Sequence, residues 1–278
     1  MPLVYACITP HGGEILPELA GDRFEAFAPT RRAMEELGRN MAAHRPDVII
    51  VVTPHGLRLE GFNSVVTAAY SSGSLTGPGG AKVEMTARCD RELAREIVAR
   101  VRAAGIPAVG CNYGALEGPG SNVALDWGAM VPLYFFGYGP ASTEPRPDVV
   151  LIGPTRDIPL AQLVEMGRVI ANIAENSERR IAFVASADQA HAHSEKGPYG
   201  YNVAAAEYDR LIQEIVEEDR LQRLLDIDLA FVEEAKPDSL WQMVMLLGVT
   251  EVVPMKGRFL SYQVPTYFGM LCASYDRV

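Results

Sequence analysis

Short apolar runs alternate with amphipathic segments along most of the chain. Residues 3–10 (LVYACITP) and 47–54 (DVIIVVTP) are continuous apolar runs that each end with a proline. Runs of this kind are typical of strands that are buried on both faces of a sheet. Between them, residues 28–44 carry apolar positions at helical spacing. The first fifty residues therefore predict a strand, a helix and a second strand.

The middle of the chain continues with strand and turn signals. Residues 63–70 (NSVVTAAY) and 81–89 (AKVEMTARC) predict two more strands, and the Gly- and Ser-rich segment 71–80 predicts a flexible loop between them. The next segment, residues 90–105, predicts a helix that begins at the acidic N-cap Asp90 and ends at a glycine.

The second half keeps this alternation and then becomes largely helical. Strands are predicted at residues 148–154, 180–188, 250–255 and 264–275. Helices are predicted at residues 160–177, 204–226 and 239–248. Such alternation predicts an α/β fold with a central, mostly parallel or mixed sheet flanked by helices on both faces. The Pro-rich segment 139–148 is interpreted as a surface loop rather than a link, so we predict one catalytic domain over residues 1–278.

Composition and charge narrow the function classes. A chain that is 48% hydrophobic and 22% charged is typical of a globular enzyme. The net charge of −10 argues against nucleic-acid and anionic-membrane partners, because no broad basic surface neutralises phosphates. Four scattered cysteines without a CxxC pair indicate buried thiols in a reducing compartment. With no leader-like segment and no apolar run long enough to span a bilayer, we predict a cytoplasmic protein.

Three of the five histidines follow predicted strands. His11 and His55 each occupy the third position of a Thr-Pro-His-Gly sequence, and His191 follows the strand at residues 180–188. Functional groups of α/β sheets gather beyond the carboxyl ends of the strands. The proline restricts the backbone before each of the first two histidines, and the glycine after it permits a sharp bend. Two neutral imidazoles presented in this way suit a divalent ion such as iron, zinc or manganese.

A metal held by two histidines usually takes a carboxylate as well, and the residues alone leave that ligand open. Glu14 lies near His11 in the sequence, and Asp126 lies in the mid-chain segment ALDWGAMVPL. The acidic segment FVEEAKPDSLW contributes three further candidates, Glu233, Glu234 and Asp238. Asp238 also has a purely structural interpretation, as the cap of the helix that begins near Ser239.

Four segments, in order, resemble the class III extradiol ring-cleavage dioxygenases, the superfamily of the protocatechuate 4,5-dioxygenase catalytic subunit. These segments are TPHGGE, VVTPHG, ALDWGAMVPL and SADQAHAHSEKGPYGY, and they extend over most of the chain. The resemblance implies that His11 and His55 bind non-haem Fe(II). It also implies a carboxylate ligand at the start of a late helix, which matches Asp238 to within one residue and leaves Glu234 in reserve.

The resemblance further implies that His191 acts as acid and base, while His193 assists it or shapes the pocket. The mid-chain motif departs from the family, because Trp127 stands where a histidine is common. An indole there stacks on an aromatic substrate or packs in the core. Tyr199 and Tyr201, in the segment GPYGYN, are further pocket candidates.

Cationic candidates for a substrate carboxylate are Lys196, Lys256 and Arg258.

The expected cofactor is Fe(II), with zinc or manganese as alternatives. Two imidazoles and one carboxylate leave adjacent positions open on an octahedral iron. The resemblance implies that a small aromatic diol and O2 occupy those positions and that the ring is opened beside its hydroxyls. An aminophenol is an alternative substrate. We expect a homo-oligomer, and a small partner subunit is found in some relatives.

Two other functions remain open at this point. The first is a metal-binding relative with a redox or signalling role, which the Asp238 and Trp127 departures favour. The second is a zinc hydrolase, in which the same histidines hold zinc and His191 or an acid activates water.

Overall fold

The structure is a computed structural model that describes residues 2–140, 142 and 145–278. An eight-stranded mixed sheet runs through it in the order β10-β11-β1-β9-β2-β8-β3-β6. Its strands are β1 (Leu3–Thr9), β2 (Val48–Val52), β3 (Asn63–Val66), β6 (Ala108–Cys111), β8 (Asp148–Gly153), β9 (Ile181–Ser186), β10 (Met255–Gln263) and β11 (Met270–Arg277). The four central strands, β1, β9, β2 and β8, are mutually parallel. Their carboxyl ends therefore meet at one edge.

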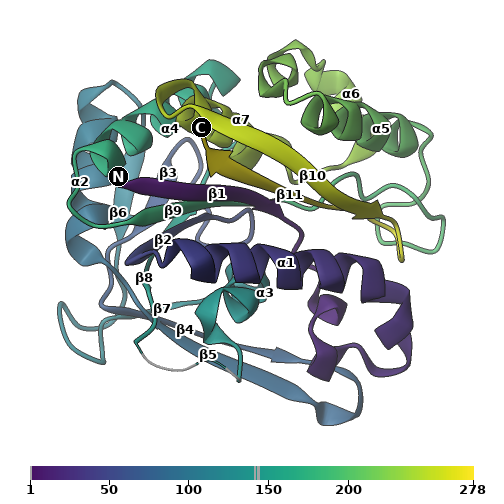
Figure 1. Cartoon of the computed structure of the whole chain (residues 1–278), viewed down its shortest axis with the longest axis horizontal. Helices are drawn as coiled ribbons and strands as arrows, with labels where there is room; N and C mark the ends of the chain where they lie inside the picture. Colours follow the sequence, from purple (N-terminus) through teal and green to yellow (C-terminus); the bar gives the residue numbers. More distant parts are fainter. Residues whose placement is uncertain (1, 141, 143–144) are drawn as a thin grey trace.

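Helices cover both faces of this sheet (Figure 1). They are α1 (Ala28–His44), α2 (Arg91–Ala103), α3 (Trp127–Leu133), α4 (Leu160–Glu175), α5 (Ala204–Glu217), α6 (Leu229–Ala235) and α7 (Leu240–Val252). A π-helical turn, Tyr134–Tyr138, follows α3, and short 3-10 turns lie at Gly13–Ile15, Pro17–Leu19, Gly21–Phe27, Pro78–Gly80 and Leu221–Asp226. The α/β fold with helices on both faces is confirmed.

Two hydrophobic cores lie on opposite sides of the sheet, because successive side chains of each strand point to opposite faces. On β1, Ala6 and Ile8 face the core formed with α2, α4, α5 and α7. Tyr5 and Cys7 face the second core, with α1 and α3. The continuous apolar pattern of β1 follows from this burial on both faces. All four cysteines are buried and free, as expected.

The predicted loop at residues 71–80 is wrong for most of its length. Tyr70–Thr76 forms strand β4, which pairs with β5 (Lys82–Arg88) and β7 (Asn122–Ala124) in a separate three-stranded sheet. Gly73 in this strand permits close packing, since a Cβ there would lie 2.2 Å from the Leu125 carbonyl oxygen.

The predicted strand at residues 250–255 is also wrong over most of its length. Helix α7 continues to Val252, and β10 begins at Met255. Buried residues occupy nearly every position of α7, so neither helical nor strand periodicity marks its end in the sequence. Within the described part of the chain, no helix is both long and apolar enough to cross a membrane.

Candidate metal centre

The carboxyl edge of the parallel strands gathers the predicted histidines. His11 follows β1, His55 follows β2 and His191 follows β9, and these three strands are neighbours in the sheet. Asp238 reaches the same place from the turn between α6 and α7. Residues more than two hundred positions apart thus meet at one edge.

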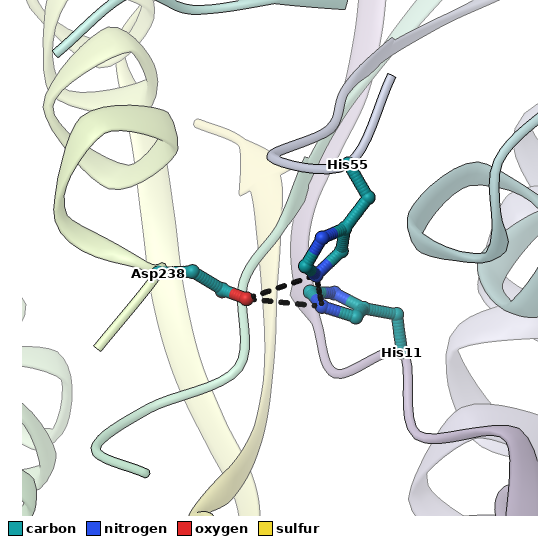
Figure 2. Close-up of side chains that lie close together, drawn as sticks. All are labelled: His11, His55 and Asp238. Carbon is teal, nitrogen blue, oxygen red and sulfur yellow. Dashed lines mark hydrogen bonds and ion pairs between the residues drawn. The ribbon is translucent and has the colours of Figure 1, made fainter. Parts of the chain in front are cut away.

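Three potential ligand atoms converge there (Figure 2). The Nε2 atoms of His11 and His55 are 3.0 Å apart. Asp238 Oδ2 lies 3.3 Å from the first and 3.1 Å from the second. All three atoms lie within 4.8 Å of one another. Asp238 Oδ2 is buried and makes no well-aligned hydrogen bond within the described residues.

The tautomer of His11 can be worked out from its hydrogen bonds. Ser186 Oγ donates its single proton to the Gly128 carbonyl oxygen. The same Oγ lies 3.0 Å from His11 Nδ1, so it accepts the Nδ1 proton of the neutral ring. The lone pair of His11 is then on Nε2, which faces His55 and Asp238. An outer hydrogen bond that fixes the ring in this way is usual for a metal-binding histidine.

Asp188 is a second buried carboxylate beside His11. Its Oδ1 accepts a hydrogen bond from the His11 backbone N–H at 3.0 Å, and its Oδ2 lies 3.2 Å from His11 Nε2. Burial raises the pKa of Asp188 above its ordinary value, against the opposing charge of His11. Burial alone would lower the pKa of His11, but Asp188 and Asp238 outweigh it and raise that pKa to about 9.

Asp238 is held by the loop that follows β9. Its Oδ1 accepts a hydrogen bond from the Asp188 backbone N–H at 3.0 Å, and its own N–H faces the Asp188 carbonyl oxygen. Burial would raise the pKa of Asp238, but the charge of His11 and the close imidazole rings of His11 and His55 lower it overall. Among the described residues, Asp238 Oδ1 bonds to Asp188 and Oδ2 has no hydrogen-bond partner, so the side chain does not cap α7 and that structural interpretation is wrong.

His191 lies next to this cluster, with its Nε2 3.9 Å from Asp238 Oδ2. Its ring stacks on Phe268 at a centroid distance of 5.3 Å and meets Tyr199 edge-on at 5.6 Å. Burial lowers the pKa of His191, and Asp238 only partly offsets this. The imidazole is therefore neutral at pH 7 and can accept a proton.

Trp127 covers the outer face of His55. The two rings stack at a centroid distance of 4.1 Å, and the indole is 46% exposed, so it is not a core residue. Asp126 is the N-cap of helix α3. Its side chain accepts hydrogen bonds from the Ala129 backbone N–H and from the Thr53 hydroxyl. Cavities of about 630 and 640 Å³ adjoin the centre, the first lined by Trp127 and the second by His55.

The other predicted acids lie outside the cluster. Glu14 pairs with Arg23 at the surface, and Asp126 has the capping role described above. Glu233 pairs with Lys236, while Glu234 is exposed on α6.

The remaining polar candidates also have other surroundings. His193 Nε2 lies 2.8 Å from Asp209 Oδ2, so this nitrogen is engaged with Asp209 rather than directed at a substrate. Lys256 pairs with Asp219, and Arg258 pairs with Glu36. Lys196 and Tyr201 are exposed.

Sequence reasoning missed four residues around the centre: Ser186, Asp188, Tyr267 and Phe268. Asp188 carried a usable signal, because an acid directly after a buried strand lies at the carboxyl edge. Tyr267 and Phe268 carried no such signal in the sequence. They precede β11, which reaches the site only through its antiparallel pairing with β1.

Comparisons with known proteins identify the family and the fold of the chain. A family model described as the catalytic LigB subunit of aromatic ring-opening dioxygenase matches residues 5–270. The curated Protein CA_C1420 of Clostridium acetobutylicum is 27% identical over 256 residues, which cover 92% of this chain and 54% of that protein. The chain thus spans about half the length of this relative. The crystal structure of the uncharacterised protein JW3007 from Escherichia coli K12 has the same fold, with a TM-score of 0.61, 19% identity, and coverage of 98% of this chain and 99% of that one.

Proposed function

The chain belongs to the family of the catalytic LigB subunit of aromatic ring-opening dioxygenase, within the class III extradiol superfamily, and from this premise we propose that it is a non-haem Fe(II)-dependent extradiol dioxygenase. The observation that carries the proposal is the convergence of His11, His55 and Asp238, whose ligand atoms lie within 4.8 Å of one another. We further propose that residues 1–278 form one catalytic domain.

The donor set fits the proposed ion. Two imidazole nitrogens and one carboxylate oxygen are the ligands of the facial-triad iron oxygenases. The buried Asp238 Oδ2, which lacks a well-aligned hydrogen bond, and the lone pair that His11 Nε2 carries in the neutral ring both favour a cation between them. When bound, iron would supply the electron-transfer chemistry that lets ground-state O2 react with an aromatic ring.

His191 is the group that we propose to move protons. A catechol must lose a phenolic proton to bind as a chelate, and ring opening later requires a proton donor. The neutral His191 accepts the first proton, and the resulting imidazolium can return it. Asp238, 3.9 Å away, stabilises the imidazolium while it exists.

The substrate that we propose is a catechol or an aminophenol. The exposed Trp127 indole beside His55 offers an aromatic face, and Tyr199 forms an edge of the aromatic group around His191. His193 has a different role in the proposal. Its contact with Asp209 holds the loop that carries His191, so His193 positions His191 and does not contact the substrate.

Anaerobic reconstitution with Fe(II), followed by a panel of catechols and aminophenols under air, tests the proposal. We expect one iron per chain, oxygen uptake, and new visible absorbance from a ring-opened semialdehyde. Protein loaded with zinc is the matched control, because zinc occupies the same ligands without redox chemistry. Full iron loading with no oxygen uptake for any compound would contradict the proposal and favour a non-dioxygenase relative; ester or amide hydrolysis by the zinc form would favour a hydrolase.

A further inference from the structure

A further cavity lies at the other edge of the sheet, where the parallel strands begin. Its volume is about 820 Å³, which is larger than either cavity beside the metal centre and within the usual range for small-molecule sites. Asp47 and Asp148 line it at the amino ends of β2 and β8. The whole of β2 separates it from His55, a length of about 17 Å at the usual rise per residue.

Part of the lining of this cavity is apolar. Met41 comes from the last turns of α1, and Phe135 and Phe136 come from the π-helical turn that follows α3. The helix and the turn pack closely, since a Cβ on Gly38 would lie 2.6 Å from the Phe135 carbonyl oxygen. A π-helical turn is rare and is frequently found at functional sites. Aromatic and apolar side chains of this kind suit the ring of a small ligand.

The polar part of the lining is mainly cationic. Five arginines line the cavity, against only two acids among the described residues. The arginines are Arg45, Arg88, Arg146, Arg179 and Arg180. The chain as a whole has a net charge of −10, so a generally basic composition does not explain this local excess. Guanidinium groups beside apolar surface favour an organic anion.

Both acids of the cavity are already paired with arginines. Arg180 Nη2 lies 2.8 Å from Asp47 Oδ1, and Arg88 Nε lies 2.7 Å from Asp148 Oδ1. The two acids are neighbours, because the Asp148 backbone N–H donates a hydrogen bond to the Asp47 carbonyl oxygen at 3.0 Å. Neither acid is therefore left to neutralise Arg45, which lines the same cavity.

Arg45 has two features that point to a ligand. It is the C-cap of α1 and has a left-handed backbone, with φ 46° and ψ 58°, where glycine or asparagine is usual. Its guanidinium makes no ion pair or hydrogen bond within the part of the chain that the structure describes. A long cationic side chain without a partner, held at an unfavourable backbone position beside a cavity, is typical of a binding residue.

We propose that this cavity binds a small aromatic anion, either a carboxylate or a phosphate ester. The anionic group lies against Arg45 and its neighbouring arginines, and the ring packs against Met41 and Phe135. A guanidinium matches either anionic group in two parallel hydrogen bonds. The site is separate from the metal centre and does not depend on the proposed dioxygenase activity.

Titration of the full chain with fluorescent aromatic ligands tests this site. The ligands are 2-naphthoate and 2-naphthyl phosphate, with 2-naphthamide as the neutral analogue, and each is added to the protein as purified and after treatment with a chelator. We expect wild type to bind at least one of the anions about tenfold or more tightly than the amide, as for charge-assisted hydrogen bonds. Chelation should leave this affinity unchanged. The anion that binds more tightly distinguishes a carboxylate from a phosphate ester.

Substitutions of Arg45 locate the bound anion. Arg45→Gln should lower the affinity for the anion by about tenfold without weakening the amide, and Arg45→Lys should restore part of it. Arg45→Gly should weaken anion binding equally while its urea midpoint stays at or above that of wild type, because glycine suits the left-handed backbone. The matched control is Arg102→Gln, since Arg102 is also exposed and lines a separate cavity of about 400 Å³.

Arg102→Gln should bind the anion as wild type does. Equal binding of the anions and the amide by wild type would overturn the proposal. Loss of anion binding on chelation would place the ligand at the metal centre instead. An unchanged affinity in Arg45→Gln, or an equal loss in Arg45→Gln and Arg102→Gln, would show that no specific anion site exists at this cavity.

Discussion

The two Thr-Pro-His-Gly segments, residues 9–12 and 53–56, have the same sequence and different surroundings. The first places His11 in the interior, where its side chain is 1% exposed, with Ser186 on Nδ1 and Asp188 beside Nε2. The second places His55 at the margin, 24% exposed at its side chain.

The glycine that follows each histidine also differs in how tightly it is packed, Gly12 more tightly than Gly56. A Cβ on Gly12 would lie 2.6 Å from the side chain of Met270, whereas one on Gly56 would lie 3.2 Å from Asp126. Identical tetrapeptides thus present two different ligands. His11 is anchored in the interior, whereas His55 stacks on Trp127 and lines a cavity. The neighbours contributed by β9 and α3 make this difference, rather than the tetrapeptide itself.

The largest effects are expected from His11→Gln and His55→Gln. Both variants should lose bound metal, because each removes one imidazole ligand. Only His11→Gln should also destabilise the metal-free fold, by about 1–3 kcal/mol, since it leaves buried polar partners unpaired. Metal analysis and urea unfolding of the metal-free proteins measure the two effects. Equal free energies of unfolding would remove the distinction between the segments.

Asp238→Ala and Glu234→Ala separate the two late acids. Asp238→Ala should lower metal affinity by more than the roughly 100-fold that loss of an outer hydrogen bond can cost. Glu234→Ala should retain wild-type affinity, because its side chain is exposed on α6. Titration with a competing chelator measures both. If only Glu234→Ala lost its metal, the assignment of Asp238 as the third ligand would be wrong.

Ser186→Ala tests whether the anchored histidine depends on its outer hydrogen bond. Without the hydroxyl, the His11 ring is free to take the other tautomer, and metal affinity should fall by about 10–100-fold. Ser274→Ala is the matched control, because Ser274 is equally buried and its Oγ makes no hydrogen bond within the described residues. Equal affinities of the two variants would show that Ser186 has no orienting role.

The pH dependence of metal binding follows from the raised pKa of His11. In the metal-free protein that pKa is about 9, so below this pH the metal must displace a proton. Affinity should rise by up to about tenfold per pH unit towards pH 9 and then level off. The protonated His11 stabilises the metal-free fold fully below its ordinary pKa of 6.5, and this stability is lost as the pH rises through about 9. Chelator titrations from pH 6.5 to 9.5 that give a flat profile would contradict the shift.

Trp127→Leu should have the smallest effect. The variant keeps an apolar side chain but loses the stacked indole, which is worth about 0.5–1.5 kcal/mol in aromatic pairs. We expect KM for a catechol to rise several-fold at unchanged metal content. Steady-state kinetics on the iron form measure this change, and an unchanged KM would place the substrate away from His55.

Much of the fold could be predicted because the parallel strands are buried on both faces and read as continuous apolar runs. The strand β4 could not, since a side chain on Gly73 would collide with the Leu125 carbonyl oxygen, and the glycine and serines of this segment look like a loop in the sequence. The end of α7 was hidden for a related reason: a helix buried all round has no polar stripe to mark its limits.

The histidines and Asp238 could be located in the sequence, the former as strand-end residues and the latter through the family resemblance. The stacking of Arg156 on Trp241 could not, because it joins the loop after β8 to helix α7, about eighty-five residues later in the sequence. The roles of Ser186 and Asp188 likewise depend on the pairing of β9 with β1, which no local pattern states.

Anomalous diffraction from a crystal of the iron-loaded protein is the most direct measurement. We expect one peak per chain at about 2.0–2.2 Å from His11 Nε2, His55 Nε2 and an oxygen of Asp238, the usual range for nitrogen and carboxylate ligands. A peak at any other set of side chains, or full occupancy of iron with Asp238 turned away from it, would contradict the shared site.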